Sequence, residues 1–290
     1  MSKMADAVRN VMESMVPELD ALHERGLFTK QELQEVVKRR TACEYAIRRP
    51  GGKTTAADFI RYVEYEGKLE ELRKLRMKTP RALEAAKNDK IRRRTKGRAE
   101  FCIVRRMHFI FTRAINKFSG DVRVWKAYFE FCKKQGGSKT FSRALTKALQ
   151  LHPTKPGMWI EAASWELNGH KNEGAARALL QQGLRICKDS PALWYEYFKF
   201  ELLMARRMQL RKEVVQLGEG EPGLKYSAKV ASGAVARVVM NKALEALGQE
   251  KDVFANLLKA VGEFDKDAFA DLEEEIVALF VSFKKRRSAA

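Results

Sequence analysis

The sequence predicts an all-α fold, a right-handed α-solenoid of stacked helix–turn–helix repeats that follows an N-terminal helical leader. Three tryptophans recur at a nearly constant interval: Trp159 lies 34 residues after Trp125, and Trp194 lies 35 residues after Trp159. A period of this length is typical of stacked helix–turn–helix units. Each tryptophan also begins an apolar pattern of helical spacing, and a second helical pattern precedes it.

Aromatic and small apolar residues follow each tryptophan at offsets of 3, 4 and 6 residues, which places them on one stripe of a helix. A glutamate comes at offset 7 in two repeats and at offset 5 in the first. We expect the aromatic side chains to form the core between the helices. The three sets are Trp125, Tyr128, Phe129, Phe131 and Glu130; Trp159, Ala162, Ala163, Trp165 and Glu166; and Trp194, Tyr197, Phe198, Phe200 and Glu201.

The helix before each tryptophan carries a small residue 11 positions upstream, and this residue would let neighbouring helices approach closely. These small residues are Ala114, Ala148 and Gly183. Prolines lie in the connections between the helices, where Pro153 and Pro191 break the preceding helix. Pro191 also suits the first turn of the next helix, because an N–H at that position would have no partner within the helix.

Residues 1–54 form the predicted leader. Apolar residues at steps of three and four predict one amphipathic helix over residues 8–22, with Pro17 as its weak point, and Gly26 suits its end. Thr29 and Glu32 have the spacing of a capping box, so a second helix should begin there.

That second helix continues to about Ile47 and carries its cations, Arg40 among them, on faces other than the apolar one. The loop after it contains Gly52-Lys53-Thr54, which looks like the end of a phosphate-binding loop. The glycine required five residues earlier is replaced by Ile47, and a helix rather than a strand precedes the loop, so we reject a nucleotide site.

Residues 55–117 should form a first repeat with an insertion. Phe59, Tyr62 and Glu66 copy the repeat pattern with phenylalanine in place of tryptophan, and the second helix is delayed to 98–117. Between them, residues 82–90 could be helical, whereas the polar run around Arg94 to Gly97 is predicted to be a loop.

This insertion is strongly basic. The span 68–106 holds 15 basic and 5 acidic residues, a surplus of 10 out of the chain's net charge of +19. It is interpreted either as a solvated face or nuclear import signal, or as a contact for RNA phosphates or for an acidic partner. The three consecutive arginines should lie outside the packed helices. The candidate contacts lie where the basic residues are densest, and they are Lys87, Lys90, Arg92, Arg93, Arg94, Lys96 and Arg98.

Residues 118–217 should hold the regular repeats, and residues 218–290 a degenerate one. Helix is expected to continue to about Leu217, followed by a loop over 218–223. A helix then restarts near Val235, Phe254 takes the tryptophan position of the next one, and a last helix begins near Asp267.

Composition favours a polyanionic environment, because the net charge is +19 and the pI is near 9.8. No apolar run reaches the roughly 18 residues of a transmembrane helix, so no membrane association is expected. The four cysteines and four histidines lack metal-ligand spacing, so neither a metal nor a cofactor is expected. No catalytic constellation has useful spacing, and we expect the protein not to be an enzyme.

The repeat pattern resembles the HAT (half-a-TPR) repeat of RNA-processing proteins, which combines an aromatic-rich first helix and a glutamate with a proline in the following loop. The leader is more specific. Its ordered series (residues 23–30, 37–41, 44–45, 58–66, 69–70 and 72–74) resembles the U3 small nucleolar RNA-associated protein 6 family, TPR-like HAT-repeat subunits of the small-subunit processome.

This resemblance implies a non-enzymatic scaffold in the nucleolus. It implies membership of the UTP-B subcomplex with β-propeller partners, association with the U3 snoRNP on pre-rRNA, and a role in rRNA processing to 18S rRNA and in 40S ribosome biogenesis. Two alternatives stay open: direct RNA binding through the basic insertion, and a HAT scaffold of mRNA processing. The absence of an RNP-type or KH motif argues against base-specific RNA recognition.

Overall fold

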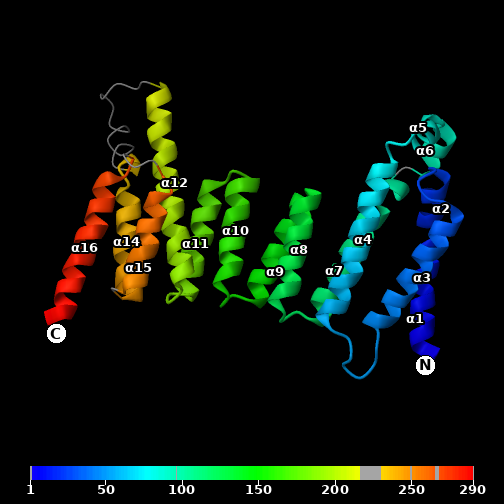
Figure 1. The fold of residues 1–290 in the computed structure, drawn as a ribbon, viewed down its shortest axis with the longest axis horizontal. Helices are drawn as coiled ribbons and strands as arrows, with labels where there is room; N and C mark the ends of the chain where they lie inside the picture. The colour runs from blue at the N-terminus through cyan, green and yellow to red at the C-terminus, as the bar shows by residue number, and fades with distance from the viewer. Residues whose placement is uncertain (1, 96, 216–229, 249, 265–267, 290) are drawn as a thin grey trace. The chain divides into compact units, whose positions relative to one another are not determined.

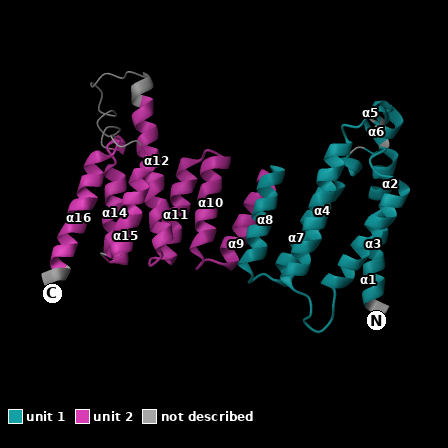
Figure 2. Ribbon diagram, viewed as in Figure 1, with its two compact units in different colours: residues 1–136 teal, residues 137–290 magenta. Residues whose placement is uncertain are grey.

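The described residues are helices joined by turns, without a strand, which confirms the all-α class (Figure 1). The helices fall into two compact units, residues 1–136 and 137–290 (Figure 2). No helix in the described part of the chain is long and apolar enough to cross a membrane. The computed structural model describes residues 2–95, 97–215, 230–248, 250–264 and 268–289.

The first unit begins with two helices where one was predicted, α1 (Ser2–Glu13) and α2 (Val16–Glu24). Pro17 lies in the first turn of α2, where it lacks an N–H and its ring would clash with a carbonyl in a continuous helix, so the chain breaks just before it. The break places Met15 fully inside the core. Gly26 ends α2 in the left-handed conformation at φ 68°, as expected.

Helix α3 (Lys30–Ile47) begins at the predicted capping box. The Glu32 N–H donates to the Thr29 hydroxyl at 3.3 Å, and the Thr29 N–H donates to the Glu32 carboxylate at 2.8 Å. Each of these contacts satisfies a backbone or side-chain group at the helix start that would otherwise lack a partner.

Helices α4 (Ala56–Arg76) and α7 (Arg98–Lys117) pack against each other, although a segment of the chain separates them. Helix α7 spans the residues that the sequence predicted. The buried side chains of Phe59 and Tyr62 lie on the inner face of α4, and the Phe59 ring meets Phe118 edge-on at a centroid distance of 5.9 Å.

The basic insertion is helical for most of its length, in two short helices, α5 (Pro80–Lys87) and α6 (Asp89–Thr95). The predicted loop around Arg94 is therefore wrong up to Thr95. Asn88 interrupts the first helix and caps the second, because its side-chain oxygen accepts from the N–H groups of Lys90 and Ile91 at 3.1 and 3.3 Å. The turn comes at Gly97, where φ is 71°, and Lys96 lies outside the described residues.

Helix α8 (Val122–Gln135) completes the first unit by packing on α4 and α7. The second unit is a row of antiparallel helices in which α10 packs on α9, α11 and α12, and α12 packs on α14 and α15. These helices are α9 (Ser138–Leu151), α10 (Pro156–Gly169), α11 (Glu173–Ile186), α12 (Pro191–Val215), α14 (Ala234–Leu247), α15 (Lys251–Gly262) and α16 (Ala270–Ala289).

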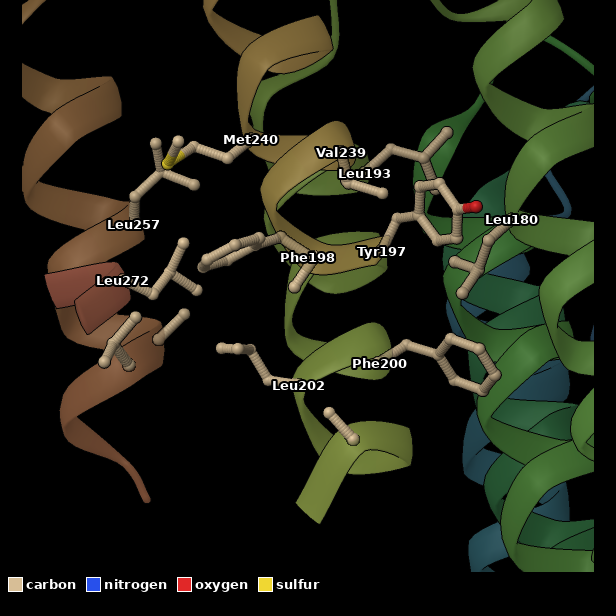
Figure 3. Close-up of a cluster of buried hydrophobic side chains, with 14 of the residues drawn as sticks. Leu180, Leu193, Tyr197, Phe198, Phe200, Leu202, Val239, Met240, Leu257 and Leu272 are labelled. Atoms are coloured by element: carbon tan, nitrogen blue, oxygen red, sulfur yellow. The ribbon is translucent and has the colours of Figure 1, made fainter. Parts of the chain in front are cut away.

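Side chains from α10 to α16 build one continuous apolar core in the second unit (Figure 3). Phe198 from α12 and Phe254 from α15 are among its fully buried members, so the predicted phenylalanine substitute for tryptophan lies in the core. The last helix begins at Ala270, close to the expected start, and the predicted loop at 218–223 lies outside the described residues.

The small residue predicted at position 183 is required by a close contact between helices. A Cβ atom built on Gly183 in α11 would lie 2.8 Å from Cγ of Trp159 and 3.0 Å from Cδ2 of Leu193. Backbone and indole therefore touch directly, and any side chain at this position has to displace α10 or α12.

We expect G183A to lower the free energy of unfolding by about 1–2 kcal/mol, because overpacking outweighs the better helix propensity of alanine. Gly174, in the same helix, supplies the matched control: its nearest neighbour to an added Cβ is 3.7 Å away, so G174A should leave stability unchanged or slightly raised. Urea unfolding of the two variants measures this. Equal effects at both positions would contradict the close contact.

Candidate functional site

The repeated tryptophans share one structural role, which is to hold the connection that precedes their helix. Each indole N–H donates to a backbone carbonyl six residues upstream, and the three distances are 2.9, 2.8 and 2.8 Å. The pairs are Trp125 with Ser119, Trp159 with Pro153, and Trp194 with Lys188.

The backbone of these connections repeats as well. At each one, the N–H seven residues before the tryptophan donates to the carbonyl of the small residue eleven before it, at 2.7 to 2.8 Å. The predicted period is therefore a recurrence of the same helix–turn–helix connection, between α7 and α8, α9 and α10, and α11 and α12. The donor–acceptor pairs are Phe118 with Ala114, His152 with Ala148, and Cys187 with Gly183.

Most of the predicted aromatic signature lies in the core. Two tryptophans are only partly covered: Trp165, whose ring meets Phe141 edge-on at 4.3 Å, and Trp194. Pro191 is the exposed first residue of α12, and Pro153 lies half-buried in its loop. The buried members are Phe59, Tyr62, Trp125, Tyr128, Trp159 and Tyr197.

The predicted glutamates divide into two kinds. Glu66 and Glu201 are buried, and each accepts two hydrogen bonds from an arginine on a neighbouring helix. Glu130 is exposed beside Lys133, and Glu166 is partly covered beside His170. At offset 7 from Trp125, where Glu66 and Glu201 would have their counterpart, the chain has the buried Cys132, so the first tryptophan repeat lacks the ion pair.

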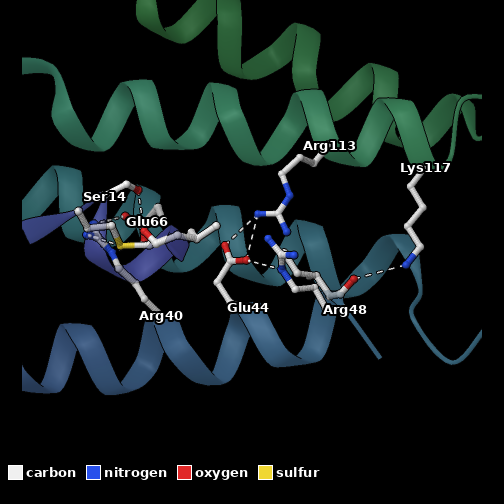
Figure 4. Close-up of polar contacts among 10 residues, drawn as sticks. Ser14, Arg40, Glu44, Arg48, Glu66, Arg113 and Lys117 are labelled. Carbon is white, nitrogen blue, oxygen red and sulfur yellow. Dashed lines mark hydrogen bonds and ion pairs between the residues drawn. The ribbon is translucent and has the colours of Figure 1, made fainter. Parts of the chain in front are cut away.

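The most enclosed ion pair joins α3 to α4 (Figure 4). The Arg40 guanidinium donates from Nε and Nη2 to the two Glu66 oxygens, both at 2.8 Å, and both side chains are almost wholly inaccessible to solvent. Burial of Arg40 lowers its pKa, but the attraction of Glu66 and the hydrogen bonds to it outweigh this effect, so the pKa of Arg40 is raised. The expectation that Arg40 faces outward is wrong.

A second buried carboxylate, Glu44, contacts an arginine just after its own helix and another from α7 (Figure 4). Arg48 reaches it at 3.3 Å, and Arg113 reaches it at 2.9 Å. Arg40 and Glu44 continue the helical register of the buried Val36 and Ile47, and this spacing is the signal that could have placed both residues inside.

The capping residue Glu32 also ties α3 to α4, because Arg76 donates to its two oxygens at 2.6 and 2.9 Å. The hydrogen bonds from Arg76, together with that from the Thr29 backbone, lower the pKa of Glu32 to about 2. Three arginine–glutamate contacts therefore bind α3 to the helices that follow it.

The candidate basic contacts lie on α5, α6 and the start of α7. Lys87, Lys90, Arg93 and Arg98 are exposed, and Arg93 lies 3.7 Å from Asp89. The side chains of Arg92 and Arg94 lie outside the described residues, as does Lys96. Because α6 packs against α5 and α2, the basic segment is a helical cap on the leader.

A groove of about 580 Å³ opens between α4, α7 and α8. Apolar side chains such as Ile60, Val63 and Phe111 line it, and its rim carries both carboxylates and lysines, including the 3.1 Å contact of Lys134 with Glu71. The groove could accept an apolar side chain of a partner, and its mixed rim favours neither charge.

The thiols have the environment of structural cysteines. Burial raises the pKa of the Cys102 and Cys132 thiols to about 11, while Cys43 and Cys187 are partly accessible. His108 packs edge-on against Phe131 at 4.8 Å, and burial lowers its pKa. Within the described residues, no three metal-ligating side chains gather in one place.

We expect E66Q to destabilise the protein by about 3–5 kcal/mol, because it leaves Arg40 charged and unpaired in the core. Replacing both partners, in R40M/E66L, should cost less than E66Q. The surface pair of Glu35 and Lys38 supplies the control, since E35Q should cost about 0–1 kcal/mol. Urea unfolding measures the free energy of unfolding of the three variants. A small loss of stability in E66Q would contradict the burial of the Arg40–Glu66 pair.

The lowered pKa of Glu32 predicts an acid-sensitive contribution to stability. Its ionised form stabilises the folded state fully above the unfolded value near 4.5, and this stabilisation is lost as the pH falls toward 2. The free energy of unfolding, measured between pH 6 and about pH 2, should therefore depend less on pH in E32Q than in the unmodified protein. E35Q, altered at the surface of the same helix, should retain the original dependence; an unchanged E32Q profile would contradict the assignment.

Comparison with known proteins identifies relatives. Residues 12–106 match the family model described as U3 small nucleolar RNA-associated protein 6. The U3 small nucleolar RNA-associated protein 6 homologs of Mus musculus and Homo sapiens are each 30% identical over 278 residues, 95% of this chain and 45% of the relative. The Schizosaccharomyces pombe protein of that name is 32% identical over 215 residues, 73% of this chain and 41% of the relative.

The chain thus spans less than half the length of the curated relatives it matches. The family match covers the leader from residue 12, α4, the basic insertion and half of α7, and the similarity to the mouse and human relatives extends through the tryptophan repeats. Over the stretch that these relatives share with it, the chain belongs to the U3 small nucleolar RNA-associated protein 6 family.

Proposed function

We propose that this protein is a non-enzymatic scaffold subunit of the small-subunit processome, within the UTP-B subcomplex of the U3 snoRNP. In this role it supports pre-rRNA processing to 18S rRNA, and so 40S ribosome biogenesis, in the nucleolus. The observation that carries the proposal is the 30% identity over 95% of the chain to proteins named for association with U3 small nucleolar RNA.

We also propose that the helix pairs are HAT repeats stacked as a right-handed α-solenoid. The recurring indole-to-carbonyl bond and the buried Glu66 and Glu201 support this assignment, because a repeat fold requires equivalent side chains to make equivalent contacts. Such an array offers faces to partner proteins, and the proposed partners are the β-propeller subunits of UTP-B.

The buried charged groups support a structural role. Glu44, Glu66 and Glu201 each have arginine partners that hold one helix to another. These carboxylates are occupied by packing contacts, which fits a scaffold better than acid–base chemistry.

Direct RNA contact through the basic insertion is a second candidate function. Its support is the exposure of Lys87, Lys90, Arg93 and Arg98, which surround α5 and α6 with positive charge. Phosphate contacts of this kind give affinity without sequence specificity and weaken steeply with salt.

Purification of the tagged chain from cells tests the scaffold proposal against a scaffold of mRNA processing. Recovery of U3 RNA with β-propeller proteins is the expected result. Recovery of spliceosomal or polyadenylation components without U3 RNA would overturn it.

We expect K87E/K90E/R93E to weaken association with the U3 particle while the melting temperature changes by less than about 2 °C, because substitutions at exposed sites usually have small effects on stability. Sedimentation of the tagged variant on a gradient measures association, and thermal unfolding measures stability. K139E/R143E, at exposed positions of α9, is the control. Unaltered sedimentation of K87E/K90E/R93E would show that the basic insertion does not lie at the interface with the particle.

A further inference from the structure

Helix α7 presents a row of alternating arginine and phenylalanine to solvent. Arg98, Phe101, Arg105 and Phe109 follow one another at steps of 3, 4 and 4 residues, which places them along one face. Phe101 is 58% exposed and Phe109 is 45% exposed. The Arg105 side chain is 57% exposed, and Arg98 is exposed as well.

The exposed rings contrast with the other aromatic groups of α7. His108 and Phe111 pack against Tyr128 and Phe131 of α8, whereas Phe101 and Phe109 are exposed to solvent. Two phenylalanines on one solvent-facing row are not accounted for by the core. The Arg113 guanidinium lies 5.0 Å from the centre of the Phe109 ring, so this ring already stacks with a planar cation.

The charge around the row is positive. The exposed Lys87, Lys90 and Arg93 lie on the helices that lead directly into α7. Glu18 of α2 lies beside the row, closer to the buried Arg106, at 3.4 Å, than to Arg105, at 3.9 Å. Glu100, next to Phe101, is paired with Arg25 at 3.1 Å. Arg105 also donates from Nη2 to the Gly97 carbonyl at 3.0 Å, and its exposed guanidinium remains accessible to a ligand.

We propose that this row binds single-stranded RNA, with bases stacked on Phe101 and Phe109 and phosphates held by Arg98 and Arg105. Flat aromatic faces and cations alternating along about 16 Å of helix match the alternation of base and phosphate in a single strand. An acidic peptide would use the arginines and leave the rings without a flat partner. Stacking of this kind tolerates any base, in keeping with the absence of a base-reading motif.

This inference extends the proposed function and is tested separately from it. Binding of RNA by the purified chain needs no partner protein and is traced to the row by variants of the row's own residues, whereas recovery of U3 RNA from cells also depends on partner proteins. Each can therefore fail while the other holds. The row shares only Arg98 with the basic contacts discussed above, and its rings distinguish it from a purely electrostatic surface.

Fluorescence anisotropy of the full chain with a labelled 12-nucleotide single-stranded RNA, over a series of salt concentrations, is the test. We expect F101A/F109A to weaken binding at least about 25-fold, since each of the two stacked bases contributes about five-fold or more. Its salt dependence should stay the same, because no charge is lost. R98Q/R105Q should instead reduce the slope of log affinity against log salt by about 1.4, or about 0.7 for each phosphate.

Matched controls remove exposed apolar or charged groups elsewhere on the surface. L151A/I186A alters two exposed apolar residues of the second unit and should leave RNA affinity unchanged, unlike F101A/F109A. R143Q/R211Q alters two exposed arginines of the same unit and should leave the salt slope unchanged, unlike R98Q/R105Q. F101W/F109W keeps flat rings and should restore binding, which excludes misfolding as the cause of the loss. Equal binding of duplex RNA, displacement by a polyglutamate peptide at the same charge concentration, or full binding by F101A/F109A would each overturn the proposal.

Discussion

The hydrogen bond from a tryptophan indole to a loop carbonyl is the interaction on which the repeated architecture depends. At the end of a helix the last carbonyls lack partners, and the following turn exposes further ones. In three connections the indole ring is packed between helices while its N–H reaches the carbonyl six residues back. One side chain thus stabilises the turn and the helix packing together, which phenylalanine could not do.

Buried ion pairs perform the corresponding task in the leader. Arg40 with Glu66 and Arg113 with Glu44 join α3 to α4 and α7, across 26 and 69 residues of sequence. Because each buried charge would be costly alone, the pairs specify which helices meet. Helices α5 and α6 then interrupt the sequence between α4 and α7 without separating them, and their described basic side chains, Lys87, Lys90 and Arg93, remain at the surface.

Much of the fold follows from local rules that the sequence displays. The tryptophan period, the capping box of Thr29 and the limits of α7 all depend on nearby residues, and all were predicted. The break at Met15 and the helix α6 were missed because local signals competed: Pro17 is compatible with starting a helix as well as with loosening one, and arginine is a good helix former even in a dense basic run. Arg40 was placed outside because its partner lies 26 residues away. The candidate basic residues were recognised by charge, whereas the exposure of Phe101 could only come from the packing of α7.

The loop between α3 and α4 is a place where the chain can accept added residues. Gly51 and Gly52 both adopt positive φ there, and a Cβ built on either would meet nothing within 4 Å. The Arg40–Glu66 and Arg76–Glu32 contacts join the flanking helices without the help of this loop. Extra residues between the two glycines would leave those contacts in place, which makes this loop a suitable site for inserting a reporter domain.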